Sequence, residues 1–173
     1  MNLIQTIQFV GVSTEKLYNA YLDSAEHGKM TTSGEGEDQT TWFRPGTGNV
    51  AKAKVGDELR CWGFKDGQGN QVYNLKAMVL ELVPNSVIVQ TWKNLPFTMA
   101  TNKELITEIP STLVLNFKKT AFGSEIHMAH INVPDYEVFI EPTGEKAPLG
   151  TIINTHWGLQ YWEPMQKYFG CNK

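Results

Sequence analysis

The hydrophobic pattern of this chain is strongest in its last segment, Thr151 to Phe169. Trp157, Tyr161 and Met165 recur at a spacing of four residues, which places them on one face of an α-helix. Gly170 follows at a position where helices usually end. The pattern therefore predicts a long terminal helix that lies with its aromatic face on another part of the molecule.

The start and the middle of this helix carry further signals. Thr151 or Asn154 can cap its first turn through a side-chain oxygen. Pro164 has no backbone N–H to donate, so the pair Glu163-Pro164 predicts a kink. Gly158 has two interpretations: it lets another group approach the helix closely, or it allows tight packing on a sheet.

Most of the preceding chain alternates hydrophobic and polar residues as β-strands do. Strands are predicted at Leu3–Val12, Asp57–Gly63, Tyr73–Val83, Ser86–Lys93, Thr112–Thr120 and Ser124–Val133, with a further short strand at Thr40–Arg44. The first is expected at a sheet edge, because both of its faces mix polarities. Ile126, Met128 and His130 share a face that we expect to be interior. The short Pro84-Asn85 link predicts an antiparallel hairpin.

The remaining segments are helical or irregular. Ser13 and Thr14 are expected to begin a helix, and a second turn is predicted at Ala25–Met30, broken by Gly28. Residues 31–55 and 135–150 are predicted to be loops. Adjacent strands with segregated helices favour an α+β fold. We therefore expect one domain, residues 1–173, with a curved antiparallel sheet of about six to seven strands wrapped around the terminal helix, and one or two short helices after the first strand.

Composition limits the partners of the protein. Its 173 residues are 41% hydrophobic and 19% charged, as in an ordinary globular domain. The net charge of −3 gives no basic excess for nucleic acid or an anionic membrane. No apolar run approaches the roughly 18 residues of a membrane span. The distant cysteines Cys61 and Cys171 suit a reducing cytoplasm, which we expect as the location.

Four segments together resemble the START-like superfamily: VGDELRCWGFKDGQG, LVPNSVIVQTWK, STLVLNFKKTAFGSEIHMAHINVP and HWGLQYWEPMQKYF. They are most similar to the branch that includes the C-terminal domain of the activator of heat-shock-protein-90 ATPase. The resemblance implies a helix-grip fold with an apolar cavity between the sheet and the terminal helix. Members of the superfamily bind lipids, hormones or polyketides, and a few catalyse cyclisation or hydration. It carries over no catalytic residues; the matching tryptophans are Trp92 and Trp157.

On this basis we name candidate site residues. The expected cavity wall consists of Trp62, Trp92, Phe117, Met128, His130, Trp157, Tyr161 and Met165. The alternative is that these side chains simply fill the core. His130 is either a hydrogen-bonded core histidine or a polar anchor for an otherwise apolar ligand. Trp42 and Phe43 either tuck into the domain or form a lid.

No metal, cofactor or catalytic residue is expected. His127 and His130 are three residues apart on a strand, so they point to opposite faces and cannot share an ion. His27 and His156 are isolated in the sequence. The chain contains no Gly-x-Ser-x-Gly nucleophile signature and no phosphate-binding loop.

Three functions stay open. The first is binding of a small hydrophobic or aromatic molecule without catalysis. The second is a co-chaperone-like module in stress-response regulation, although we do not expect a chaperone partner because the chain lacks an additional partner-binding domain. The third is a cyclase- or hydratase-like enzyme, for which only His130 and Glu81 or Arg60 offer ionisable groups. A homodimer is also an open alternative.

Overall fold

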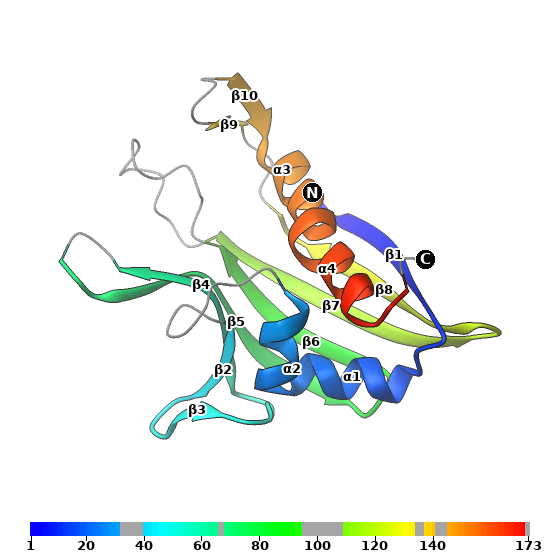
Figure 1. Cartoon of the computed structure of the whole chain (residues 1–173). Helices are drawn as coiled ribbons and strands as arrows, with labels where there is room; N and C mark the ends of the chain where they lie inside the picture. Colours follow the sequence, from blue (N-terminus) through cyan, green and yellow to red (C-terminus); the bar gives the residue numbers. More distant parts are fainter. Residues whose placement is uncertain (32–39, 66–67, 95–108, 134–136, 141–144, 172–173) are drawn as a thin grey trace.

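The computed structural model describes residues 1–31, 40–65, 68–94, 109–133, 137–140 and 145–171. They form an α+β fold in which a large antiparallel sheet curves around the helices, all of which lie on one side of it (Figure 1). The predicted fold class is thereby confirmed.

The large sheet has eight strands in the order β1-β8-β7-β6-β5-β4-β2-β3. Their bounds are β1 (Leu3–Val10), β2 (Thr41–Arg44), β3 (Gly48–Val50), β4 (Glu58–Lys65), β5 (Gln71–Val83), β6 (Val87–Asn94), β7 (Ile109–Thr120) and β8 (Gly123–Ile131). A separate two-stranded sheet joins β9 (Glu137–Ile140) to β10 (Glu145–Pro148). The hairpin predicted across Pro84-Asn85 is the antiparallel pair β5 and β6.

The strand number is higher than the predicted six to seven, with ten strands in the described parts of the chain. The additional strands lie in the two segments that were predicted to be loops. β3, β9 and β10 are only three or four residues long, which is too short for alternation to be recognised, and turn residues such as Pro45 and Gly46 dominate their surroundings. β2 corresponds to the short strand predicted at Thr40–Arg44.

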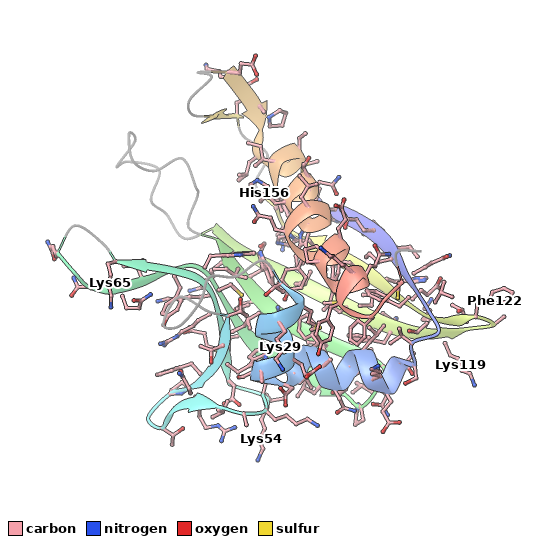
Figure 2. All side chains as sticks on the ribbon, viewed as in Figure 1. Lys29, Lys54, Lys65, Lys119, Phe122 and His156 are labelled. Carbon is pink, nitrogen blue, oxygen red and sulfur yellow. The ribbon has the colours of Figure 1, made fainter. Side chains whose placement is uncertain are left out.

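The alternation in β7 and β8 is confirmed by burial. Ile126, Met128 and His130 are all buried, while the intervening residues are only partly covered. The two strands form a long hairpin whose tip carries Phe122, a side chain that points away from the body of the protein (Figure 2). The inner face of the sheet therefore forms one side of the hydrophobic core.

β1 is an edge strand, as predicted, and pairs only with β8 among the described strands. Its free edge lies near the terminal helix. The side-chain nitrogen of Gln166 donates to the backbone oxygen of Gln8 at 2.9 Å. The side-chain nitrogen of Gln5 donates to Asn154 Oδ1 at 2.7 Å. The first contact satisfies one backbone group of the edge that would otherwise be open to another strand, and the second joins β1 to the helix through side chains.

Two short helices follow β1, as predicted: α1 (Thr14–Leu22) and α2 (Ser24–Met30). Ser13 caps α1 by accepting from the backbone N–H of Lys16. Asp23 caps α2 by accepting from the N–H of Glu26 at 3.0 Å. The prediction that Gly28 breaks α2 was wrong, because the helix is continuous through it to Met30.

The terminal helix has three parts: α3 (Leu149–His156), a π-helix η3 (Trp157–Trp162) and α4 (Glu163–Tyr168). The predicted caps Thr151 and Asn154 were wrong, because α3 already begins at Leu149, after Pro148, without a side-chain cap bond. The end is confirmed: Gly170 has φ +72° and donates to the carbonyl of Lys167 at 3.0 Å.

The interruption predicted at Glu163-Pro164 takes the form of the π-helix. The N–H of Glu163 donates five residues back to the carbonyl of Gly158, which is the π pattern. Pro164 then falls in the first turn of α4, where a missing N–H costs nothing. No described group approaches the helix closely at Gly158, since a Cβ there would have only Glu163 Oε1 nearby, at 3.9 Å.

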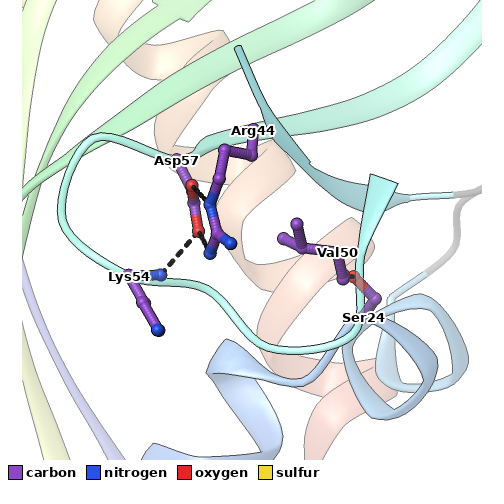
Figure 3. Close-up of polar contacts among 5 residues, drawn as sticks. All are labelled: Ser24, Arg44, Val50, Lys54 and Asp57. Atoms are coloured by element: carbon purple, nitrogen blue, oxygen red, sulfur yellow. Dashed lines mark hydrogen bonds and ion pairs between the residues drawn. The ribbon is translucent and has the colours of Figure 1, made fainter. Parts of the chain in front are cut away.

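An ion pair holds β2 and β3 against the rest of the sheet (Figure 3). Arg44 donates through Nε and a terminal nitrogen to the carboxylate of Asp57 at 2.7 and 2.8 Å. Asp57 is 2% exposed and also accepts from the backbone N–H of Lys54 at 2.8 Å. Ser24 Oγ donates to the backbone oxygen of Val50 at 2.6 Å, which joins α2 to β3.

Candidate functional site

The inner face of the terminal helix meets the sheet through large aromatic side chains. Trp157, Tyr161 and Met165 are 3%, 1% and 1% exposed, whereas Leu159 is 55% exposed. The predicted aromatic face is therefore buried. The wider π turn also lets Trp162 face inward, where its indole N–H donates to Gln5 Oε1 of β1 at 2.8 Å.

Rings from the sheet and the helix are in direct contact. The ring centroids of Trp92, from β6, and Trp157 lie 4.6 Å apart. Trp157 also stacks on Trp162 at 5.1 Å and meets the edge of Tyr161 at 5.1 Å. Such pairs are worth about 0.5–1.5 kcal/mol each beyond the area they bury. Ring packing therefore contributes both to the contact between the helix and the sheet and to the order of the aromatic side chains within the helix.

His130 of β8 is fully buried within this cluster. The indole N–H of Trp157 donates to its Nδ1 at 3.2 Å, so Nδ1 carries no hydrogen. Its Nε2 must then be the protonated nitrogen, which donates to Ser111 Oγ at 2.6 Å. Ser111 passes its own hydrogen to the backbone oxygen of Trp92 at 2.9 Å. Because the imidazole donates to Ser111, it cannot act as the base of a serine nucleophile.

A second buried histidine, His27 of α2, was not predicted to belong to the site. Its Nδ1 lies 2.5 Å from the backbone oxygen of Tyr21, which can only accept, so Nδ1 carries the hydrogen. Its Nε2 therefore accepts from the hydroxyl of Tyr161. Trp42 adds a further donor to the Tyr21 carbonyl, at 3.1 Å. The terminal helix is thus tied to α2 through Tyr161 and His27.

Burial keeps both histidines uncharged. Desolvation lowers the pKa of His27 to about 4, although its backbone hydrogen bond acts weakly in the other direction. Desolvation likewise lowers the pKa of His130 to about 4. Burial also raises the pKa of the Cys61 thiol to about 12, which leaves it a poor nucleophile. This region is therefore polar at points but carries no charge near neutral pH.

Gln90 of β6 is a further buried polar residue on the sheet side of this interface. Its side chain is fully buried, and its amide nitrogen donates to the hydroxyl of Tyr21 at 2.9 Å. The ring of Tyr21 also lies beside that of Tyr161, with the ring centroids 6.3 Å apart. The amide oxygen of Gln90 has no partner among the described residues.

The structure brings some of the predicted wall residues together and separates others. Trp92, His130, Trp157 and Tyr161 are in mutual ring contact. Phe117 is buried beneath α1, where it meets the edge of Tyr18 at 5.6 Å.

The other wall candidates lie elsewhere in the same core. Met128 lies buried on β8 between Gln5 and Leu115 of the neighbouring strands. Trp62 is only half-buried and has φ 52°, so it departs from regular strand geometry. A role for any of these residues in ligand binding stays a prediction.

Trp42 and Phe43 of β2 face opposite sides of the sheet. Trp42 is fully buried, with its ring 5.9 Å from His27, which corresponds to the interpretation that it tucks into the domain. The guanidinium of Arg60 lies 3.5 Å from the ring centre of Phe43, as in a cation–π contact. A lid function for the two rings stays a prediction.

Within the described ranges no three His, Cys, Asp or Glu side chains lie together as metal ligands would. His127 and His130 do face opposite sides, as predicted: His127 lies 2.5 Å from Glu125 Oε1 on the outer face. His156 is half-buried on α3 (Figure 2).

None of the described helices is long and apolar enough to cross a bilayer.

Three solved structures have a fold similar to that of this chain. An Hsp90 activator from Plasmodium falciparum is 17% identical, with 98% of this chain and 96% of that one covered and a TM-score of 0.59. A protein from Mesorhizobium loti is 14% identical, with 100% and 99% covered and a TM-score of 0.58. The Aha1 dimer from Colwellia psychrerythraea is 14% identical, with 92% and 89% covered and a TM-score of 0.51. At these identities the likeness concerns the fold.

The sequence, unlike the fold alone, identifies the protein family. No curated protein matches the chain. The family described as Activator of Hsp90 ATPase homolog 1-like protein matches residues 11–170, which is nearly the whole sequence. The order of strands and helices resembles that of the solved structures over almost their full length. The chain therefore belongs to the Activator of Hsp90 ATPase homolog 1-like protein family.

Proposed function

We propose that the protein binds a small hydrophobic or aromatic molecule between the sheet and the terminal helix. The observation that carries this proposal is the π-helix over Trp157–Trp162, which lies where Trp157 and Tyr161 meet the sheet. π-Helices make up well under 1% of residues and recur at functional sites. Here the wider turn presents three aromatic side chains to the interface instead of the two that an α-helical turn would present.

Catalysis is not part of the proposal. A cyclase or hydratase needs an acid or base that can exchange a proton with its substrate. The protons of His27 and His130 are directed to protein oxygens, and both imidazoles stay neutral. Cys61 has a raised pKa and is fully buried. The buried polar groups therefore favour positioning of a ligand over proton transfer.

The test has two steps. Native mass spectrometry of the protein as purified from cells should reveal bound apolar molecules. Titration with naphthalene, followed by tryptophan fluorescence, should then give saturable quenching that Met165→Ala weakens and Leu159→Ala leaves unchanged. Both substitutions shorten a helical side chain of similar size, but only Met165 is buried. Absence of saturable quenching in the unsubstituted protein would contradict the proposal.

Regulation of the Hsp90 chaperone is the second candidate. The family match and the similarity to the Plasmodium falciparum Hsp90 activator favour it. Isothermal titration of the full chain with an Hsp90, together with the Hsp90 ATPase rate, would decide this point. Saturable binding with a raised ATPase rate would rank this function above ligand binding, and heat changes equal to dilution would remove it.

We propose two further properties, the location and the oligomeric state. A cytoplasmic location is supported by the two cysteines, which are both free thiols. A homodimer is supported by the similarity of the fold to the Aha1 dimer from Colwellia psychrerythraea. Light scattering after size-exclusion chromatography measures the oligomeric state directly.

A further inference from the structure

Gln90 is the one described residue of the aromatic interface with a buried polar atom that lacks a partner. It lies on β6 between Val79 of β5 and Leu113 of β7, and its side chain is fully buried. Its amide nitrogen reaches the hydroxyl of Tyr21, but its amide oxygen contacts no donor. Native proteins almost always provide partners for such atoms, so this oxygen is the described atom of the interface that most needs a donor from another molecule.

The hydrogens of the neighbouring buried groups are directed elsewhere. His27 Nδ1 must donate to the Tyr21 carbonyl, so His27 Nε2 accepts the hydroxyl hydrogen of Tyr161. The Tyr21 hydroxyl oxygen accepts from the Gln90 amide nitrogen at 2.9 Å. The part of Gln90 that is left open is therefore its amide oxygen, which can only accept.

We propose that Gln90 Oε1 is the polar anchor for the ligand, which is therefore a neutral apolar molecule bearing a hydroxyl or N–H group. This inference rests on the proposed function and narrows its ligand class. A carboxylate or phosphate does not fit, because its oxygens would face another acceptor. Moreover, no Lys or Arg is buried in the described part of the chain. The two buried histidines are uncharged and their hydrogens are already donated.

Four probes with the same ring system separate these possibilities. Naphthalene supplies the apolar body alone, 1-naphthol adds a donor, 1-methoxynaphthalene adds only an acceptor, and 1-naphthoate adds a charge. We expect 1-naphthol to bind about tenfold more tightly than 1-methoxynaphthalene, as one additional buried hydrogen bond implies. The affinity for 1-naphthoate should be lower than that for naphthalene. Tryptophan fluorescence reports all four titrations.

Two substitutions test whether Gln90 is the residue that makes the protein prefer 1-naphthol over 1-methoxynaphthalene. Gln90→Met replaces the amide by an apolar side chain of similar length and should remove the preference for 1-naphthol while naphthalene still binds. Gln8→Met is the matched control on β1, where the glutamine is exposed, and should keep the preference. Circular dichroism verifies that each variant is folded. Should Gln90→Met not fold, the order of the four affinities in the unsubstituted protein still decides.

The outcomes distinguish this inference from the function on which it rests. If no probe binds, the apolar site itself is wrong and the anchor is rejected with it. If naphthalene binds but 1-naphthol is not preferred over 1-methoxynaphthalene, the apolar site stands and Gln90 Oε1 is satisfied by water only. If Gln90→Met keeps the preference, another group is the anchor and the inference is overturned.

Discussion

Acid should destabilise this protein through its two buried histidines. His27 and His130 have a usual pKa of 6.5 and a folded pKa of about 4, both lowered first by burial. Because the folded protein disfavours the protonated form, unfolding takes up protons as the pH falls. The stabilising contribution is therefore complete above pH 6.5 and is progressively lost between pH 6.5 and 4.

The magnitude follows from these pKa values. For one histidine, acidification from pH 7 to pH 5 lowers the free energy of unfolding by about 2 kcal/mol, so the pair accounts for about 4 kcal/mol. That is a large part of the 5–15 kcal/mol typical of folded domains. Burial also lowers the pKa of His156, which adds to the loss in the same direction. Asp57 does not contribute in this range, because its ion pair with Arg44 lowers its carboxyl pKa below the usual 3.8.

Urea denaturation at pH 7, 6 and 5, followed by tryptophan fluorescence, measures this loss. His130→Gln should remove about half of the pH dependence, since the amide can replace both hydrogen bonds without titrating. His127→Gln is the control on the outer face of the same strand and should leave the dependence intact. A free energy of unfolding that is equal at pH 7 and pH 5, or NMR titration of both buried imidazoles near pH 6.5, would refute the reasoning.

Four further substitutions follow from packing and hydrogen bonding and are measured by the same denaturation assay. Trp157→Ala should cost about 3–5 kcal/mol, since it removes a buried ring and the donor to His130, and a loss under 1 kcal/mol would contradict its place in the core. Gly123→Ala should be strongly destabilising, because its Cβ would lie 2.3 Å from the backbone oxygen of Phe9. In Gly158→Ala the new Cβ would meet only Glu163 Oε1, at 3.9 Å, so the free energy of unfolding should change by less than about 1 kcal/mol. Asp57→Asn should cost about 1–3 kcal/mol by weakening its bonds to Arg44, and equal stability at pH 7 would argue against the ion pair.

Regular alternation made much of the fold predictable. β7 and β8 are long enough for their inward residues to be read directly, and the spacing of Trp157, Tyr161 and Met165 identified the buried helix face. The shortest strands could not be predicted, because three or four residues do not establish a period and their pairing is decided by the surrounding sheet. The π-helix also has no signal of its own beyond Pro164, which fixes where the α-helix can resume.

The site was less predictable because its polar contacts join distant segments. His27 and Tyr161 are separated by 134 residues, and nothing in either local sequence indicates their hydrogen bond. The i, i+3 spacing of His27 and Met30 was an available signal, since a histidine on the apolar face of a helix must find a buried partner. Gln90 is buried on the same strand as Trp92, but a missing partner can be recognised only when every neighbour is in place.

The buried histidine of α2 links acid stability to the contact between the terminal helix and the sheet. Burial keeps His27 neutral, and its only hydrogen goes to the Tyr21 carbonyl, so Tyr161 must donate to His27 Nε2. Protonation of His27 would place a second hydrogen on Nε2, and the Tyr161 oxygen would then have to accept where it now donates. The hydrogen bond that ties the terminal helix to α2 therefore depends on the neutral imidazole. Acid that destabilises the fold should thus also weaken the interface at which the ligand is proposed to bind.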